Sequence, residues 1–323
     1  MRIALVILAT VIVLALGAAA AVLAWNEPEV PPPMLSVANA LDAVDFGDLP
    51  AKQTFTARDG TKLVYRGYPG NSADTVVLIH GVTFTSASMH AVARALHGRG
   101  ATVYSLSLRG HDGTGRSGDI DYVGQLDDDL EDFMKGLGPR RPGERRALLG
   151  FSAGGGFVLR FAGGARAKMF DRFVLVSPAL FYSAAPMQRP KFGGWTSVAW
   201  SRVMLLLTLS RLGIHAFDGL PVIVNAVPSD SRYSKTRTYT YRMSLNFGAG
   251  EDYLDALRRA PGSVALLAGA ADEVFIADKY APLLQPVRPD MNIEILPGLG
   301  HMDMIVKPEA LAALADKTLG PAQ

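Results

Sequence analysis

Short, continuously apolar segments alternate with helix-like segments along most of this 323-residue chain, and this alternation restricts the fold more than any other feature. The strand-like segments are rich in valine, leucine and isoleucine and cover residues 75–79, 101–106, 147–149, 173–176, 264–267 and 293–296. The helix-like segments cover residues 89–96, 126–137, 153–161, 275–284 and 308–318. Short apolar strands that alternate with helices are typical of a parallel sheet covered on both faces. The sequence therefore predicts an α/β fold with a mostly parallel, doubly wound sheet.

Two stretches depart from this alternation. Residues 54–56 and 62–65 flank Asp59-Gly60, which predicts a β-hairpin ahead of the parallel strands. Residues 178–250 are too long for an ordinary connection, and we expect an inserted helical cap there. The folded domain, with its cap, is predicted to span residues 51–323.

The N-terminus carries a long apolar segment. Residues 3–24 contain no charged side chain, and as a helix they would be about 33 Å long, which matches a bilayer core of about 30 Å. We therefore predict a transmembrane signal-anchor over residues 1–25. The alternative is a signal peptide cleaved after one of the small residues Ala18, Ala20 or Ala24, which would give a secreted protein.

The residues after this segment predict a spacer and an orientation. Residues 26–50 include Pro28 and the run 31–33 of three prolines, which favour an extended linker. Arg2 precedes the apolar segment, whereas the region behind it is acidic and has no Lys or Arg before Lys52. The positive-inside rule then places the body on the extracytoplasmic side.

Composition excludes several classes of function. The formal net charge is +2, from 32 basic and 30 acidic residues, which is too balanced for a nucleic-acid-binding protein. The chain has no cysteine, so it has no disulfide framework, no thiolate zinc site and no cysteine nucleophile.

The segment Gly150-Phe151-Ser152-Ala153-Gly154 follows one predicted strand and precedes a predicted helix. This is the G-x-S-x-G pattern in a strand–turn–helix setting, where a strained turn presents a serine hydroxyl at a helix N-terminus. We predict Ser152 to be a nucleophile. The alternative is a glycine-rich turn that serves only close packing.

A serine nucleophile needs a base, and the base needs an acid to orient it. In this arrangement the acid and then the histidine follow the serine along the chain. Of the two histidines after Ser152, His215 falls in the insertion and His301 follows the last predicted strand, so His301 is the predicted base. Asp272 follows the preceding strand and is the predicted acid.

Alternatives remain for the acid. Asp272 could instead cap a helix that begins near Phe275. Glu273 is adjacent and would point elsewhere, and Asp303 is too close to His301 in sequence to orient it easily.

An oxyanion hole needs two N–H donors. One is expected from Ala153, directly after the serine, and the other from Val82, in the loop after the strand-like segment 75–79. His80, in the same loop, is expected to be structural.

Together, the motifs His80-Gly81, Arg109-Gly110-His111, Gly150-x-Ser152-x-Gly154-Gly155 and Gly300-His301, with Asp272, resemble the α/β-hydrolase superfamily. The chain is most similar to its monoacylglycerol lipase, lysophospholipase and serine aminopeptidase-like branch. That branch usually reads R-G-H-G-x-S, whereas residues 109–117 here read R-G-H-D-G-T-G-R-S. The resemblance implies an α/β-hydrolase fold with a cap and no metal or organic cofactor.

These observations predict a membrane-anchored serine hydrolase that cleaves carboxylic esters through a Ser152–Asp272–His301 triad. The apolar cap segment 195–212 suggests an acyl pocket and a lipid-like ester, such as a monoacylglycerol or lysophospholipid, although the same residues could simply pack the cap onto the core. A peptidase, a thioesterase, an acyltransferase or a catalytically silent binding module would fit the same fold.

Overall fold

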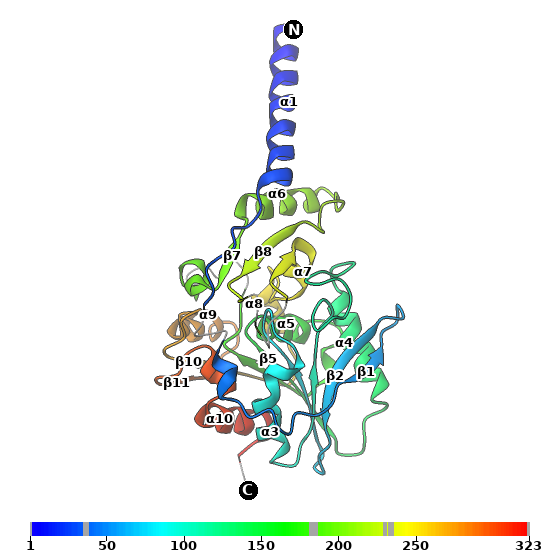
Figure 1. Ribbon diagram of the computed structural model, residues 1–323, viewed down its shortest axis with the longest axis vertical. Coiled ribbons are helices and arrows are strands. Elements are labelled where there is room, and N and C mark those ends of the chain that lie inside the picture. Colours follow the sequence, from blue (N-terminus) through cyan, green and yellow to red (C-terminus); the bar gives the residue numbers. More distant parts are fainter. Residues whose placement is uncertain (1, 35–38, 181–186, 229–230, 232–235, 322–323) are drawn as a thin grey trace.

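Eight strands form one sheet in the order β1-β2-β4-β3-β5-β6-β10-β11 (Figure 1). The computed structural model describes residues 2–34, 39–180, 187–228, 231 and 236–321. The strands are β1 (Gln53–Thr56), β2 (Lys62–Tyr68), β3 (Asp74–Ile79), β4 (Thr102–Leu106), β5 (Arg145–Phe151), β6 (Arg172–Val176), β10 (Ser263–Gly269) and β11 (Asn292–Leu296). β1 and β2 are antiparallel, as the hairpin prediction requires, and the strands from β4 to β11 are parallel. The predicted sheet is confirmed.

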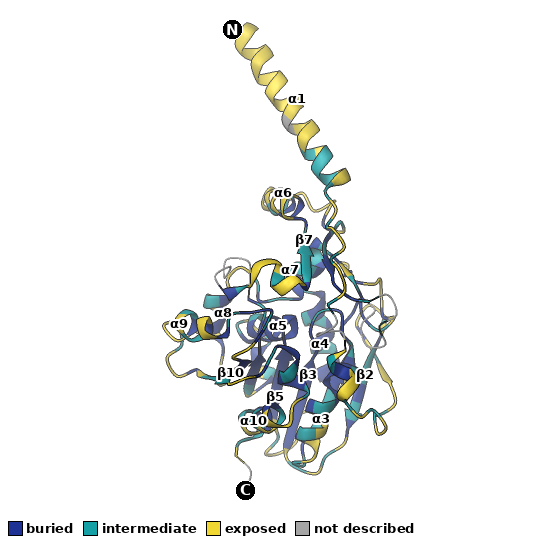
Figure 2. Ribbon diagram, turned by 60° about the vertical axis from the view of Figure 1, so that its left-hand side comes forward, coloured by how far each residue is buried: buried dark blue, intermediate teal, exposed yellow. Residues whose placement is uncertain are grey.

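Helices cover both faces of this sheet. They are α3 (His90–His97), α4 (Gln125–Gly136), α5 (Ala153–Ala162), α8 (Tyr253–Arg259), α9 (Tyr280–Leu284) and α10 (Pro308–Leu319). Alternate residues of β3 enter different cores: Val77 packs with α4 and α5, while Val76 packs with α3 and α10. Continuous apolar strands are needed because each face of the sheet is buried, as the dark core of Figure 2 shows.

One predicted helix is shorter than expected. The helix predicted over residues 275–284 is reduced to a 3₁₀ turn at Ala277–Lys279 and to α9. The reason lies in the backbone before it, because Ile276 donates to Met187 and Val274 accepts from Arg189. These bonds to the insertion take residues 274–276 out of a helical conformation.

The insertion is a mixed layer rather than the helical cap that we expected. It contains α6 (Trp200–Arg211) and α7 (Tyr241–Asn246), but also an antiparallel sheet of β7 (Thr196–Val198), β8 (Pro221–Asn225) and β9 (Thr238–Thr240). β-branched runs such as 222–224 favour strands, and their pairing partners lie too far along the chain to be recognised from sequence.

The apolar N-terminal segment forms α1 (Arg2–Trp25), which extends away from the body and is exposed over most of its length (Figures 1 and 2). Its mean hydropathy of 2.8 and its length would allow it to cross a membrane or to act as a signal sequence. Parts of the segment 26–50, which we predicted to be an extended linker, contact the folded body. Met34 donates to the carbonyl of Ala226 over 3.1 Å, and Leu41 is fully buried in the core beside α3.

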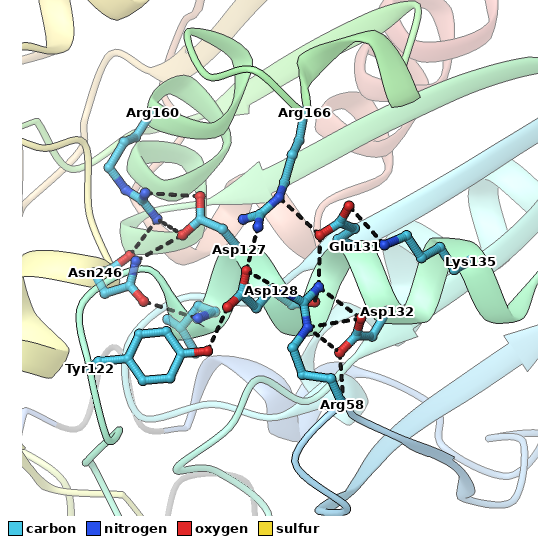
Figure 3. Close-up of polar contacts among 11 residues, drawn as sticks. Arg58, Tyr122, Asp127, Asp128, Glu131, Asp132, Lys135, Arg160, Arg166 and Asn246 are labelled. Atoms are coloured by element: carbon cyan, nitrogen blue, oxygen red, sulfur yellow. Dashed lines mark hydrogen bonds and ion pairs between the residues drawn. The ribbon is translucent and has the colours of Figure 1, made fainter.

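An ionic network holds the acidic face of α4 against its neighbours (Figure 3). Arg160 of α5 donates to both carboxylate oxygens of Asp127, at 2.9 and 2.8 Å. Arg58, from the turn between β1 and β2, donates to Glu131 over 2.7 Å. The network therefore ties the antiparallel hairpin and α5 to α4.

This network predicts acid-sensitive stability. Hydrogen bonds from Arg58 and Lys135 lower the pKa of Glu131 to about 2. Since the folded-state pKa is depressed, the stabilisation is present above the ordinary glutamate pKa of about 4.3 and is lost as the pH falls through about 2. We expect Glu131→Gln to lower the stability at pH 7 by about 1 kcal/mol or less, with a Tm gap that closes toward pH 2. Thermal unfolding of both proteins across this range measures the gap, and a gap of constant size would contradict the prediction.

Candidate active site

Ser152 lies at the carboxyl end of β5, in the sharp turn that leads into α5. Its φ of 56° and ψ of −119° form a strained conformation for a residue with a side chain. The flanking glycines are required by close approach. A Cβ on Gly150 would lie 2.1 Å from the carbonyl oxygen of Gly154, and one on Gly154 would lie 2.4 Å from that of His80. The two glycines of the G-x-S-x-G pattern are thus explained by the close backbone packing of this tight turn.

His301 and Asp272 meet across the loops that follow β11 and β10. Their closest atoms are Nδ1 of His301 and Oδ2 of Asp272, 2.8 Å apart. Both residues are buried, and the imidazole lies against Phe151, the residue before Ser152, with ring centroids 4.8 Å apart. The loops thus bring the predicted base and acid together beside the turn that carries the predicted nucleophile.

The second oxygen of Asp272 fixes its carboxylate. Oδ1 accepts hydrogen bonds from the backbone N–H groups of Val274 and Phe275, both at 2.8 Å. Burial alone would raise the pKa of Asp272, but the imidazole of His301 and these two N–H groups outweigh it and hold the pKa below its usual value. Asp272 therefore makes the cap-like bonds that we considered as its alternative role and also contacts His301.

The two neighbouring acids hold the histidine loop by its backbone. Glu273 Oε2 accepts from the N–H of His301, and Asp303 Oδ2 accepts from the N–H of Gly300, both at 2.8 Å. The positioning contact of Glu273 was not foreseen from the sequence. An acid adjacent to Asp272 was visible there, but its partner is 28 residues away.

The loop that follows β3 passes directly over Ser152. A Cβ on Gly81 would lie 3.2 Å from the Cβ of Ser152, and Val82 and Ala153 line the same cavity as Ser152. The structure thus gathers the residues predicted for the oxyanion hole around one space. His80 is fully buried, and its Nε2 accepts from the N–H of Leu108.

A buried tyrosine from the cap, which the sequence did not single out, supports this loop. Tyr239 of β9 accepts a hydrogen bond from the N–H of Thr83 over 2.5 Å and lies 2.8 Å from Nε2 of His111. Burial lowers the pKa of His111 to about 3, so its ring is neutral, and its Nδ1 is directed to the carbonyl of Arg109. Nε2 of His111 then accepts the Tyr239 proton. The cap and the loop after β3 are therefore joined by a continuous hydrogen-bond chain.

The cavity in front of Ser152 is mainly apolar. Its apolar wall is formed by Val82, Leu180, Phe192, Trp195, Val198, Ile223, Met243, Phe247 and Phe275. Most of these side chains come from the insertion. The remaining described residues that line the cavity include no Asp, Glu, Lys or Arg. The space suits an uncharged, apolar group next to Ser152.

Only the beginning of the apolar run 195–212, for which we expected an acyl pocket, lines this cavity. Trp195 and Val198 line the cavity, but no residue of α6, which is described in full, does so. Val203 and Leu206 are buried in a separate cluster inside the cap, because α6 packs on β8 rather than on the main sheet.

The sheet order, the serine turn after β5 and the loops after β10 and β11 together define an α/β-hydrolase fold. The chain belongs to the family described as serine aminopeptidase, S33, whose match covers residues 70–305. Membership of this family makes it a hydrolase.

Solved structures share this fold. The chain is similar to a monoglyceride lipase from Saccharomyces cerevisiae in complex with a substrate analogue, with a TM-score of 0.63, 17% identity, and 83% of this chain and 92% of that chain covered. It is also similar to the monoacylglycerol lipase of Paleococcus ferrophilus, with a TM-score of 0.60, 20% identity, and coverage of 79% and 99%. A putative aryl esterase from Burkholderia cenocepacia gives a TM-score of 0.58, 17% identity, and coverage of 82% and 97%.

Proposed function

We propose that this protein is a serine hydrolase that cleaves carboxylic esters by way of an acyl-enzyme. The observation that carries the proposal is the position of Ser152, in a strained turn beside an apolar cavity, with the hydrogen-bonded pair of His301 and Asp272 next to it. A nucleophilic serine requires this combination of base and orienting acid.

The proposed reaction has two steps. Ser152 Oγ attacks the ester carbonyl carbon, and its proton passes to Nε2 of His301, which returns it to the leaving alcohol. A water molecule then attacks the acyl-enzyme, gives a proton to His301, and Ser152 recovers its proton as the acid leaves. The N–H groups of Val82 and Ala153 stabilise the oxyanion in both steps. Asp272 holds the imidazole and stabilises its charged form.

The chemistry of the cavity favours an acyl ester over an aminoacyl amide. A free α-ammonium group would have to leave water, and this is costly unless a carboxylate replaces its hydration. The described residues that line the cavity supply no carboxylate. An acyl chain needs only apolar contacts, which Phe192, Ile223 and Met243 provide. A lipid-like ester, such as a monoacylglycerol or lysophospholipid, therefore fits best.

This proposal predicts a dependence on acyl chain length. Each methylene that becomes buried contributes about 0.8 kcal/mol, or about fourfold in affinity. We expect kcat/KM for p-nitrophenyl esters to rise from acetyl to at least octanoyl. Aminoacyl naphthylamides serve as the comparison series. A flat or falling ester series, or faster cleavage of the aminoacyl amides, would contradict the proposal.

We also propose that α1 anchors the enzyme in a membrane, with the hydrolase domain on the extracytoplasmic side. A contact at the end of α1 supports retention of this helix. Arg202 of α6 is buried, and it donates to the carbonyl of Leu23 over 3.0 Å, while its N–H donates to Asn26. Cleavage at a signal-peptidase site after Ala24 would remove one of the two carbonyl acceptors of this buried guanidinium and leave it only that of Pro221.

The anchor predicts resistance to extraction. The full chain should remain in the membrane fraction after a high-salt or carbonate wash, because its attachment depends on apolar burial. Deletion of residues 2–20 should release a soluble, active enzyme, since it retains the Leu23 and Asn26 contacts to Arg202. Mass spectrometry of the mature protein provides the check. An N-terminus near Ala21 or Trp25 would show that the segment is a cleaved signal peptide.

A further inference from the structure

The loop in which this chain departs from the R-G-H-G-x-S pattern lines a second cleft. The cleft has a volume of about 710 Å³, and its wall includes Gly113, Gly115 and Ser117 of that loop together with Lys52 and Arg66. It shares no lining residue with the cavity in front of Ser152 among the residues described for both. The proposed hydrolysis therefore makes no use of it.

Arg66 is the feature of this cleft that calls for an explanation. The residue is only 8% exposed, and a carbonyl oxygen, that of Pro50, accepts from its Nη1. Its Nε has no hydrogen-bond partner, and the guanidinium forms no ion pair within the described part of the chain. Burial lowers the pKa of Arg66, although an arginine side chain stays protonated in proteins. The attraction of nearby Asp112 offsets the cost of burying this charge only in part, and an anion in the cleft would reduce the remaining cost.

The other charges of the cleft cancel one another. Lys52 Nζ lies 2.6 Å from Oδ1 of Asp112, whose Oδ2 accepts from Ser107 over 3.1 Å. Asp112 is therefore already committed to two partners. The charge of Arg66 is left as the excess charge of the site.

The loop adds hydrogen-bond donors to this charge. The backbone N–H groups of Asp112, Gly113, Gly115 and Ser117 donate to no group in the ranges that the structure describes. Gly113 and Gly115 have φ values of 79° and 69°, which glycine adopts without strain. Backbone N–H groups exposed on such turns form concave sites for anions.

We propose that this cleft is a second binding site, which takes an oxyanion, phosphate or carboxylate, between Arg66 and the N–H groups of the loop 112–117. The guanidinium supplies its charge and its Nη2 group, because Nη1 donates to Pro50 and Nε is inaccessible, and the loop supplies neutral N–H donors. The site goes beyond the proposed ester hydrolysis and does not depend on it.

Binding to the full-length protein in detergent micelles tests the proposal. Inorganic phosphate, glycerol 3-phosphate and acetate are titrated separately, and the rise in Tm is followed against potassium chloride at equal ionic strength. Wild type should show a saturable rise with at least one of the three. The relative size of the Tm rise indicates where the natural anion comes from. A larger rise with phosphate indicates a free ion, whereas a larger rise with glycerol 3-phosphate indicates a lipid headgroup. No saturable rise with any of them would overturn the proposal.

Variants locate the site. We expect Arg66→Gln to weaken binding about tenfold or more, the effect of losing charge-assisted hydrogen bonds. Because Arg66 is buried in β2, Lys52→Glu serves as a second variant on the exposed rim, and it should also weaken binding. Lys62→Glu is the matched control: it lies on the same strand, outside the cleft, and should bind as wild type does. Unchanged affinity in Lys52→Glu, or an equal loss in Lys62→Glu, would place the anion elsewhere and refute the assignment.

Discussion

Replacement of Ser152 by alanine should lower kcat for p-nitrophenyl esters by about 10⁴-fold or more, with no loss of folding. The loss is large because nucleophile and base act as a unit, so that removal of either leaves only the oxyanion donors and binding. His301→Ala should therefore cause a loss of the same order. Alanine has no hydroxyl to attack the carbonyl, but it fits the space that serine occupies, and circular dichroism and Tm should remain close to wild type.

Covalent labelling with a fluorophosphonate separates an enzyme from a silent binding module. Wild type should be labelled at Ser152, as peptide mass spectrometry would show, and Ser152→Ala should not be labelled. Ser244 is the matched control, because it lines the same cavity and its hydroxyl donates to the carbonyl of Tyr241. Ser244→Ala should retain labelling and most of the activity. Ester turnover near the wild-type rate in Ser152→Ala would refute the assigned nucleophile.

The central sheet could be predicted from the sequence because each strand and the turn after it are marked by a short, continuous sequence pattern. β3, β5 and β10 are continuous apolar runs, since both of their faces are buried, and each is followed by a turn rich in glycine or alanine. The order of Ser152, Asp272 and His301 along the chain then follows from the order of the strands, because parallel strands end at one edge of the sheet. A local pattern was sufficient to place all three near one another.

The contacts that sequence could not provide are long-range. Tyr239 bonds to Thr83 across 156 residues, and Arg202 bonds to Leu23 across 179. In the sequence, Tyr239 lies in a polar stretch of the insertion, and Arg202 is a single charge within an apolar run. Tyr239 reaches its partner through the paired strands of the cap, and Arg202 reaches Leu23 through the packing of α6 against α1. The same holds for α6, whose apolar residues pack within the cap instead of facing the substrate cavity.

Asp272→Asn should lower kcat by about 10³- to 10⁴-fold while leaving the fold intact. The amide oxygen can still accept the N–H groups of Val274 and Phe275, so the loop after β10 keeps its anchor. The amide nitrogen, however, would face Nδ1 of His301 as a donor. It would favour the tautomer with the proton on Nε2, which cannot accept the proton of Ser152.

Two matched variants test whether the loss of kcat in Asp272→Asn comes from the changed contact with the imidazole of His301. Glu273→Gln and Asp303→Asn also neutralise a carboxylate near His301, but both side chains accept from backbone N–H groups of the loop and not from the ring. We expect each to reduce kcat by about tenfold or less, because one backbone hydrogen bond contributes about 1 kcal/mol. If Asp303→Asn lost as much activity as expected for Asp272→Asn, and Asp272→Asn lost little, the orienting acid would be Asp303 and the assignment of Asp272 would be wrong.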